Sequence, residues 1–444
     1  MLKDWAIRLA LVSCIVGAAA FAACGDDDDD GDNGGGDGNT PAAGQTGTGG
    51  GDQGEVNVLG IWGDEELASF EAMVAGWGGK MNFTGTRDIT AILTTRVEGG
   101  NAPDVAVPAE VGLFQQFARE GKLTPLSACP GLEDTVRNNY PQSFIDLATV
   151  DGTLYGFFMK ADTKATIFYN PKFFSDNSLE PLDDSATFDD LIALSDQIKN
   201  AGTPPWSMGQ EAGGGSGFPG SDTIQQIFIN EAGVEAYDQV VSGDIPYTDD
   251  RVKDAWEKFG QIALTDGYTV QGGGAGINAT PFMDSSYPPF ETPPTAAMVA
   301  LGGFAAGFIT DQFPNAEPGT DFDFFGWPGG AVTGGANIAY AFNSNPSTCS
   351  FMNHIASAEA QDVWVKRGGF TSVNKQVSID SYPNEVARKQ AQQLLDADTF
   401  RFDMDDAIGG AGQQAIFAGV IQYLTNPNSL DGILQSVQTA IGGQ

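Results

Sequence analysis

Apolar side chains recur along this chain with two periods, one typical of strands and the other typical of helices. Residues 56–62 predict a strand, and the apolar positions that follow them have helical spacing. Residues 104–107 predict a second strand before a helix over residues 111–120, and residues 154–169 predict a long extended stretch. Strands that alternate with helices predict α/β layers with mainly parallel sheets.

A clear helix start lies at Thr187. Its hydroxyl can cap the helix, and Asp189 and Asp190 favour the positive end of the helix dipole. Further helices are predicted over residues 250–263, 356–367, 383–395 and 412–424. Glycine is abundant in residues 209–220 and 272–276, which predicts loops near a ligand or tight turns.

Residues 1–24 form a leader. Lys3 and Arg8 flank its start, and residues 9–20 form an apolar run shorter than the about 20 residues that span a bilayer. Two alanines before Cys24 complete the pattern of an export signal, and it resembles a bacterial lipoprotein signal in which this cysteine is lipidated. The letters around Cys14 also fit, but they leave almost no apolar region, so we expect lipidation at Cys24.

Residues 25–54 form an acidic, glycine-rich segment. It holds eight aspartates and no basic residue, and such a composition cannot bury a core. We therefore expect a disordered tether. The leader and tether together predict an exported protein, lipid-anchored at the outer face of the cytoplasmic membrane.

The remaining residues are too many for one ordinary core and natural for two domains. Most of the net charge of −37 falls on them, and a surface this acidic repels phosphate backbones, which excludes nucleic-acid binding. The single histidine of the chain, His354, leaves little basis for histidine metal sites or a Ser-His-Asp triad. We expect His354 to be a surface or core residue, and we expect no metal and no cofactor.

Cys129 and Cys349 are the two cysteines that remain beyond the leader. An oxidising compartment permits a disulfide between them, although they can also be two separate thiols.

Several segments resemble the family 1 extracellular solute-binding proteins of carbohydrate ABC importers, a maltose-binding-protein-like family. They include residues 61–66 (IWGDEE), 102–105 (APDV), 123–126 (LTPL), 151–156 (DGTLYG), 168–170 (FYN), 294–304 (PTAAMVALGGF), 356–360 (ASAEA), 368–370 (GGF) and 374–375 (NK). Three further segments look most like the α-glucoside-binding branch: residues 206–212 (WSMGQEA), 217–222 (GFPGSD) and 400–406 (FRFDMDD).

The resemblance implies an α/β, two-lobe periplasmic-binding-protein fold with discontinuous lobes and an interlobe ligand cleft. The first lobe would hold residues 55–160 and 335–376, and the second residues 161–334 and 377–444. Chain crossings would fall near Lys160, Gly334 and Lys375. Both Cys129 and Cys349 would lie in the first lobe, where a disulfide would place their Cα atoms within about 7 Å.

The resemblance also implies a function. It predicts a monomeric binding protein, not an enzyme, that captures a neutral sugar and delivers it to permease subunits. The expected ligand is an α-glucoside or another mono- or oligosaccharide. The lipid at the N-terminus of the protein would be its link to the membrane.

A sugar presents hydroxyl groups and one apolar ring face, so its site needs carboxylates, amides and flat aromatic rings. The candidate contacts are Trp62, Asp64, Glu65, Glu110, Glu211, Phe218, Asp222, Phe304, Asn337 and Asp406. Three of them have open alternatives: Trp62 can be a core aromatic residue, Asp64 can cap a helix, and Glu110 can be a solvated surface residue.

The second-lobe candidates have more specific roles by resemblance. Phe304 matches the position at which the family has a stacking tryptophan, and Phe218 would be a second platform between the acceptors Glu211 and Asp222 in a glycine-rich loop. Asp406 matches an aspartate of the family, whereas Asp403 and Asp405 are expected to be solvated.

Rival functions remain. Paired carboxylates in a cleft can make a glycoside hydrolase, and a sugar sensor without transport needs the same cleft. A calcium-bound adhesin is a third option, but residues 26–30 lack the spacing of a calcium loop. Neither a phosphate-binding GxxxxGK[ST] pattern nor a zinc-binding HExxH pattern occurs in the chain.

Overall fold

Two main sheets organise the residues that the structure describes. This computed structural model describes residues 53–86, 88–164, 166–397 and 399–443, without the side chains of Asp64 and Glu65. The predicted lipidation site Cys24 lies outside the described residues, as does the predicted tether up to residue 52.

The larger sheet contains β1 (Glu55–Gly60), β2 (Lys80–Gly85), β3 (Val105–Val107), β6 (Gly156–Thr163), β11 (Val332–Ala341), β12 (Thr371–Ser372) and β13 (Phe400–Phe402). The smaller sheet contains β7 (Thr166–Tyr169), β8 (Trp206–Ser207), β9 (Met298–Ala300) and β10 (Asp323–Gly326). A short hairpin pairs β4 (Thr149–Val150) with β5 (Thr153–Leu154).

Strand directions are mixed in the larger sheet, whose order is β12-β6-β11-β3-β1-β2 with β13 also on β11. Strand β1 pairs in parallel with β2 and β3, whereas β11 runs antiparallel to both β3 and β6. In the smaller sheet, β7 is antiparallel to β9 and β10. The prediction of mainly parallel sheets is therefore wrong, because the long strands β6 and β11 carry the chain between the sheets in opposite directions.

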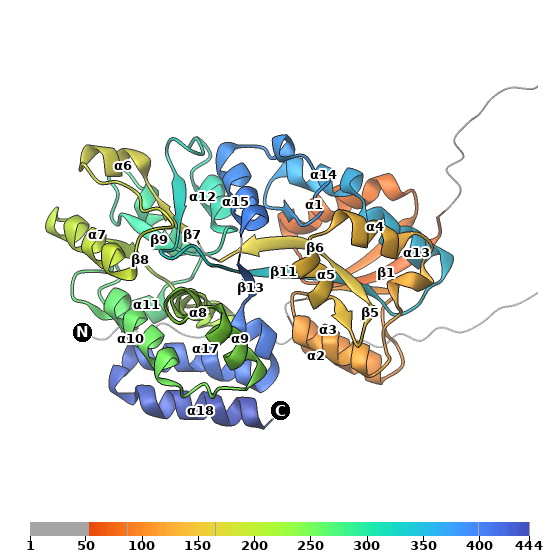
Figure 1. Cartoon of the computed structure of the whole chain (residues 1–444). Helices are drawn as coiled ribbons and strands as arrows, with labels where there is room; N and C mark the ends of the chain where they lie inside the picture. The colour runs from red at the N-terminus through yellow and green to blue at the C-terminus, as the bar shows by residue number, and fades with distance from the viewer. Residues whose placement is uncertain (1–52, 87, 165, 398, 444) are drawn as a thin grey trace, which may run out of the picture. The chain divides into compact units, whose positions relative to one another are not determined.

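The chain leaves the larger sheet after β6 and returns to it at β11, and Figure 1 shows these two strands running between two groups of helices. Strand β6 ends at Thr163 and β11 begins at Val332, and the lobe boundaries near Lys160, Gly334 and Lys375 stay predictions. Strand β13 belongs to the larger sheet, although its residues fall in the range 377–444 predicted for the second lobe.

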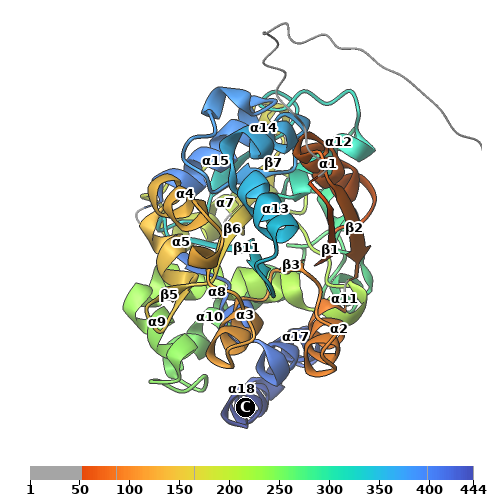
Figure 2. The ribbon, with the colours of Figure 1, turned by 90° about the vertical axis from the view of Figure 1, so that its right-hand side faces the viewer.

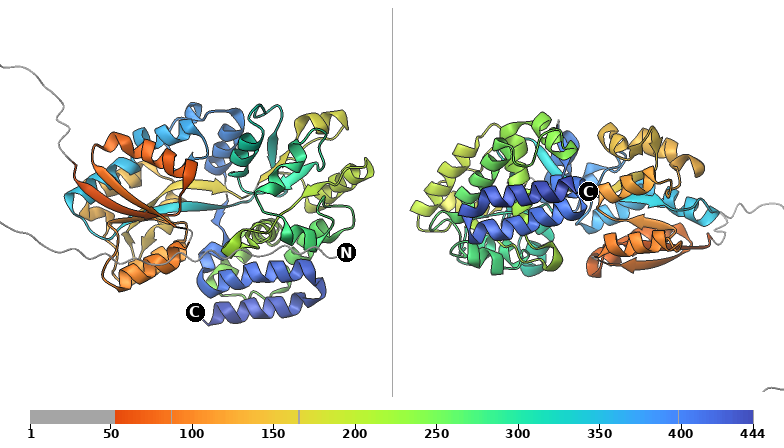
Figure 3. Two further views of the ribbon diagram at one scale, coloured as in Figure 1. Left: turned by 180° about the vertical axis from the view of Figure 1, so that it is seen from behind. Right: turned by 90° about the horizontal axis from the view of Figure 1, so that it is seen from below.

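The helices between β1 and β6, and those between β11 and β12, are α1 (Asp64–Val74), α2 (Ile89–Glu98), α3 (Val111–Arg119), α4 (Leu132–Asn139), α5 (Gln142–Leu147), α13 (Pro346–Ala356) and α14 (Ala358–Arg367). The other helices are α6 (Pro171–Asp176), α7 (Phe188–Asn200), α8 (Phe218–Ala232), α9 (Val234–Ser242), α10 (Asp250–Leu264), α11 (Gly274–Ala279), α12 (Ala305–Gln312), α15 (Glu385–Asp396), α16 (Met404–Ile408), α17 (Gly410–Thr425) and α18 (Leu430–Gly442). Figure 3 shows α17 and α18 packed side by side.

Helix α7 shows how local sequence sets an element boundary. The Thr187 hydroxyl accepts a hydrogen bond from the backbone N–H of Asp190 at 3.2 Å, and the Asp190 carboxylate accepts one from the N–H of Thr187 at 2.8 Å. This capping box confirms the predicted helix start. Apolar side chains, including Leu191 and Ile198, then bury one face of the helix.

A disulfide joins Cys129 to Cys349 beside the larger sheet. Their Cα atoms lie 5.0 Å apart, below the limit of about 7 Å for such a bond. Cys349 lies in α13, which packs against β1, β6 and β11 (Figure 2). His354 on the same helix has a structural contact, because its Nε2 lies 2.9 Å from the carbonyl oxygen of Met73 at the end of α1.

Candidate functional site

Four half-buried phenylalanines form a continuous aromatic surface, which we call the phenylalanine cluster: Phe218, Phe282, Phe304 and Phe308. The Phe282 ring centroid lies 5.0 Å from that of Phe218, 6.4 Å from that of Phe304 and 5.7 Å from that of Phe308. The Phe282 ring meets each of these three rings edge to face, an arrangement that aromatic pairs favour over face-to-face stacking. It presents the kind of apolar surface on which a sugar ring can lie.

Three separate segments bring these rings together. Phe218 is the first residue of α8, Phe304 caps the start of α12, and Phe282 follows α11. The backbone N–H of Phe282 donates to the carbonyl of Glu211 at 3.0 Å, which ties the glycine-rich segment to the cluster. The exposed Glu211 carboxylate accepts from the N–H of Gly213 at 3.1 Å. Sequence reasoning brought Phe218, Phe304 and Glu211 to one site but missed Phe282 and Phe308.

Beside this surface lies an ionic group that we call the acidic cluster: Lys164 with Asp222, Asp403, Asp405 and Asp406. The Lys164 Nζ lies 2.8 Å from Asp222 Oδ2 and 3.0 Å from Asp403 Oδ2. It also lies 5.4 Å from the centre of the Phe218 ring, a cation–π distance that joins the two clusters.

Three aspartates of the acidic cluster, Asp222, Asp403 and Asp405, are buried, and Asp406 is half-buried. Asp403 is 0% exposed and Asp405 is 3% exposed, so the expectation that they are solvated is wrong. Asp405 accepts hydrogen bonds from the hydroxyl of Ser221 and from the amide of Gln225 on α8. Asp222, expected in a loop, instead lies in the first turns of α8 with its carboxylate bound to Lys164.

Burial controls the protonation of this group. Burial first, and neighbouring carboxylates second, raise the pKa of Asp405 and of Asp406 to about 8. Burial alone would lower the pKa of Lys164, but the charges of Asp222 and Asp403 outweigh it and hold that pKa well above its usual value. Lys164 is therefore a permanent cation at the centre of the cluster.

Glu110 and Asp406 approach each other from the two predicted lobes. Glu110 precedes α3 and is half-buried, and its Oε2 accepts from the N–H of Ala109 at 3.1 Å. Burial raises the pKa of Glu110, and its charge contributes to the raised pKa of Asp406. The side-chain amide of Gln413 on α17 donates a hydrogen bond to Asp406 Oδ1 at 2.7 Å.

Two other predicted contacts lie deeper in the molecule. Trp62 is 1% exposed and packs in an aromatic core, with its ring centroid 4.7 Å from that of Phe70 and 4.9 Å from that of Trp364. Trp62 therefore occupies the core position that the sequence analysis gave as the alternative to a ligand contact. Asn337 is buried on β11 opposite Lys160, and its amide nitrogen has no hydrogen-bond partner within the described residues.

The remaining predictions rest on residues whose side chains are not described. Asp64 and Glu65 begin α1 directly after Trp62, but their side chains lie outside the described part of the chain. Their roles as ligand contacts stay predictions.

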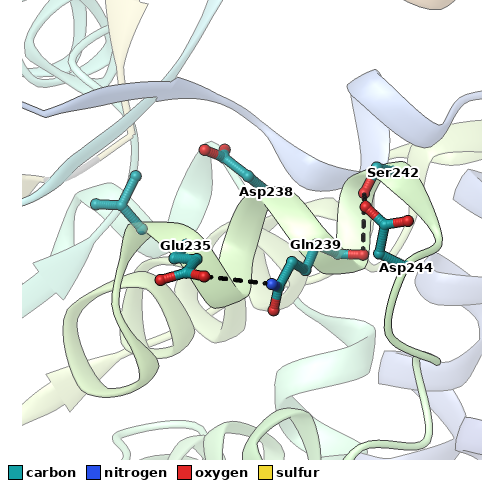
Figure 4. A pocket seen from close by; sticks show the side chains of 6 residues that line it. Glu235, Asp238, Gln239, Ser242 and Asp244 are labelled. Carbon is teal, nitrogen blue, oxygen red and sulfur yellow. Dashed lines mark hydrogen bonds between the residues drawn. The ribbon is translucent and has the colours of Figure 1, made fainter.

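A separate surface concavity lies on α9, lined by Val234, Glu235, Asp238, Gln239, Ser242 and Asp244 (Figure 4). No aromatic ring lines it, and Asp238 already forms an ion pair with Arg401, with 2.6 Å between Oδ1 and Nε. It therefore lacks the surface that a sugar needs.

In the part of the chain that the structure describes, no group of three or more histidine, cysteine, aspartate or glutamate side chains is arranged to hold a metal ion. Within the same residues, no helix is both long enough and apolar enough to cross a membrane.

The chain belongs to the bacterial extracellular solute-binding proteins, whose family model matches residues 67–391. The osmoprotective compounds-binding protein GgtB of Synechocystis sp. is 32% identical to it over 384 residues, which cover 84% of this chain and 89% of that protein. The alpha-glucosides-binding periplasmic protein AglE of Rhizobium meliloti is 31% identical over 406 residues, which cover 87% of this chain and 86% of that protein.

Solved structures show the same fold. The bacterial solute receptor AcbH matches with a TM-score of 0.74 at 17% identity, covering 88% of this chain and 99% of that one. The match confirms the predicted α/β fold with two lobes, and the family match confirms the predicted class of exported solute-binding protein. The family and these relatives are binding proteins rather than enzymes.

Proposed function

We propose that this protein is the sugar-binding component of a carbohydrate ABC importer. It captures a neutral sugar, an α-glucoside or another oligosaccharide, in a cleft between its lobes and delivers it to permease subunits as a monomer. The family supports the class of protein, and the likeness to the alpha-glucosides-binding protein AglE supports the class of ligand. The proposed mechanism contains no covalent step.

The observation that carries this proposal is the contact between the phenylalanine cluster and the acidic cluster at Phe218 and Lys164. An aromatic surface can pack on the apolar face of a sugar ring, and carboxylates beside it can accept hydrogen bonds from the hydroxyls at the ring edge. Phe304 and Phe218 supply the apolar surface in this proposal, and Glu211, Asp406 and Glu110 are the acceptors. Closure of the lobes then follows from the higher affinity of the sugar for the closed state.

Phe304→Ala should weaken binding of the cognate sugar about tenfold or more, because losing the ring removes about 1.5 kcal/mol or more of apolar burial. The sugar is identified first by thermal shift against a panel, since a ligand that binds only the folded state raises its stability. Calorimetric titration then compares wild type with Phe304→Ala.

Phe313→Ala is the matched control for that titration. Phe313 is also half-buried and follows α12, but it packs on Tyr287 with 6.2 Å between centroids, outside the phenylalanine cluster. We expect its affinity within about twofold of wild type, a difference below about 0.5 kcal/mol. Unchanged affinity in Phe304→Ala would place the sugar elsewhere. Turnover of an aryl-glycoside that Glu211→Gln abolishes would replace the binding role with a hydrolase.

We also propose that Cys24 carries the membrane anchor. Cys24→Ser should be released from membranes or should keep its leader, because the lipidated thiol is lost. Membrane fractionation with detection of the leader measures both. Unchanged processing together with unchanged membrane attachment would rule out Cys24 as the lipidation site.

A further inference from the structure

One basic side chain in the chain crossing between the sheets contacts both halves of the proposed sugar site. Lys164 lies between β6 and β7, and its backbone N–H donates to the carbonyl of Thr333 at 2.8 Å. The Lys164 side chain is 14% exposed, so it is held within the structure rather than extended into solvent. We propose that Lys164 is a positioning residue for sugar binding, which sets the orientation of Phe218 and Asp222 relative to Phe304.

The first support for this role is the number of segments that Lys164 joins. Its ammonium group forms ion pairs with Asp222 on α8 and Asp403 before α16, and it lies over the ring of Phe218. A cation that is held by two carboxylates from separate segments keeps those segments together, because breaking either pair leaves a buried charge without compensation.

The second support is packing against the loop that carries Phe304. A Cβ atom added at Gly302 would lie 3.0 Å from Lys164 Cδ, so the aliphatic part of the lysine runs directly along this loop. The N–H of Gly303 donates to the carbonyl of Thr163 at 2.7 Å, which attaches the same loop to the crossing. Lys164 therefore lies between the loop of Phe304 and the ring of Phe218.

Its ion-pair partners distinguish Lys164 from Lys160, the other lysine in this part of the chain. Lys160 and Asp162 lie on one face of β6, and Lys164 follows directly after the end of the strand. Lys160 pairs with Glu66 on α1 at 2.8 Å, and it pairs with Asp162 at 3.4 Å. Of the two lysines, Lys164 is the one whose pairs reach α8.

The fold has other attachments for α8, which allows the positioning role to be tested. The side chain of Gln226 donates to the carbonyl of Ala331 at 2.6 Å and accepts from the N–H of Thr333 at 3.0 Å. Asp405 holds the same helix through Ser221 and Gln225. These bonds remain when Lys164 is replaced, so α8 stays attached while the Phe218 ring and the Asp222 carboxylate lose the cation that orients them.

The pH dependence of binding distinguishes positioning from general stability. The titratable and charged groups that face Lys164 or its aspartates are Asp162, Asp222, Asp403, Asp405, Asp406, Glu110 and Tyr237. The positive charge of Lys164 lowers the pKa of the neighbouring carboxyls, so its removal raises them. An ionised carboxylate accepts more hydroxyl hydrogen bonds than a protonated one, so affinity should rise with pH through these pKa values.

The experiment rests on the proposed function and uses the sugar that the thermal-shift panel identifies. Lys164→Met should bind it at least about tenfold more weakly than wild type, and its affinity should reach its maximum at a higher pH. Lys164→Met/Asp403→Asn removes one of the two carboxylates that Lys164→Met leaves unpaired, so it should recover part of the lost thermal stability without recovering affinity.

Lys389→Met is the matched control. Lys389 also combines an ion pair, at 2.6 Å to Asp323, with an aromatic face, at 5.1 Å from the Phe324 ring centre, but it contacts neither cluster. Its affinity and its pH profile should match wild type. Wild-type affinity and an unshifted pH profile in folded Lys164→Met, or in the double variant, would overturn the positioning role alone. A wild type that binds no sugar in the panel would overturn the proposed function, and the positioning role with it.

Discussion

Replacing both Cys129 and Cys349 with alanine should lower the free energy of unfolding by about 3 to 5 kcal/mol. The disulfide joins residues 220 apart in sequence, and the enclosed loop contains the whole smaller sheet. In the chain-entropy model, such a bond restricts the unfolded chain most when the loop is long. Denaturant unfolding followed by tryptophan fluorescence measures the change.

Reduced wild-type protein is the control for this variant, because both cysteines are buried and their loss also changes packing. Wild type unfolded with reductant should lose most of the same free energy, whereas the double alanine variant should not respond to reductant. A double variant as stable as the oxidised wild type would show that the disulfide contributes nothing. A variant that responds to reductant would show that another thiol is involved.

Local patterns predicted the elements whose signals are local. The Thr187 capping box and the apolar face after it predicted α7, and alternation predicted the strand that becomes β1. Helix α8 was missed because Gly217, Pro219 and Gly220 are typical of loops. Proline is also favoured in the first turn of a helix, and α8 begins at Phe218 with Pro219 in that turn.

The resemblance supplied the positions of the aromatic residues in the candidate site. It did not show which aspartates are buried. Phe218 and Phe304 were placed together and lie 6.5 Å apart between ring centroids. Asp403 was expected in solvent because no local pattern shows that Lys164, 239 residues earlier in the chain, reaches it.

The prediction that the strands are mainly parallel was wrong for a similar reason. Strand-to-helix alternation favours parallel pairing, and β1, β2 and β3 follow that expectation. The antiparallel pair β6 and β11 arises because the chain inserts the whole smaller sheet between them and then returns. The segment that connects β6 to β11 is therefore more than 160 residues long, and no short sequence pattern shows that the two strands pair.

The free energy of unfolding should fall as pH rises from about 4 to about 8, because the folded state retains protons on the acidic cluster that the unfolded state releases. Asp405 and Asp406 have ordinary pKa values of 3.8, and burial raises both to about 8. Between these values the folded state binds more protons than the unfolded state, so each pH unit costs about 1.4 kcal/mol per retained proton. Urea unfolding at several pH values across this window measures the slope.

Asp405→Asn/Asp406→Asn should flatten that slope and raise stability most at pH 8, because asparagine cannot ionise. An amide oxygen can still accept the bonds that Ser221, Gln225 and Gln413 donate to these positions, so the packing should persist. Asp176→Asn, at an exposed aspartate paired with Lys172 on α6, is the matched control and should keep the wild-type slope. A wild-type stability that rises with pH across this window, or an unchanged slope in the double variant, would show that these carboxyls are ionised in the folded protein. The acidic cluster would then depend on Lys164 alone to compensate its charge, and removing that lysine would have its largest effect on folding rather than on sugar binding.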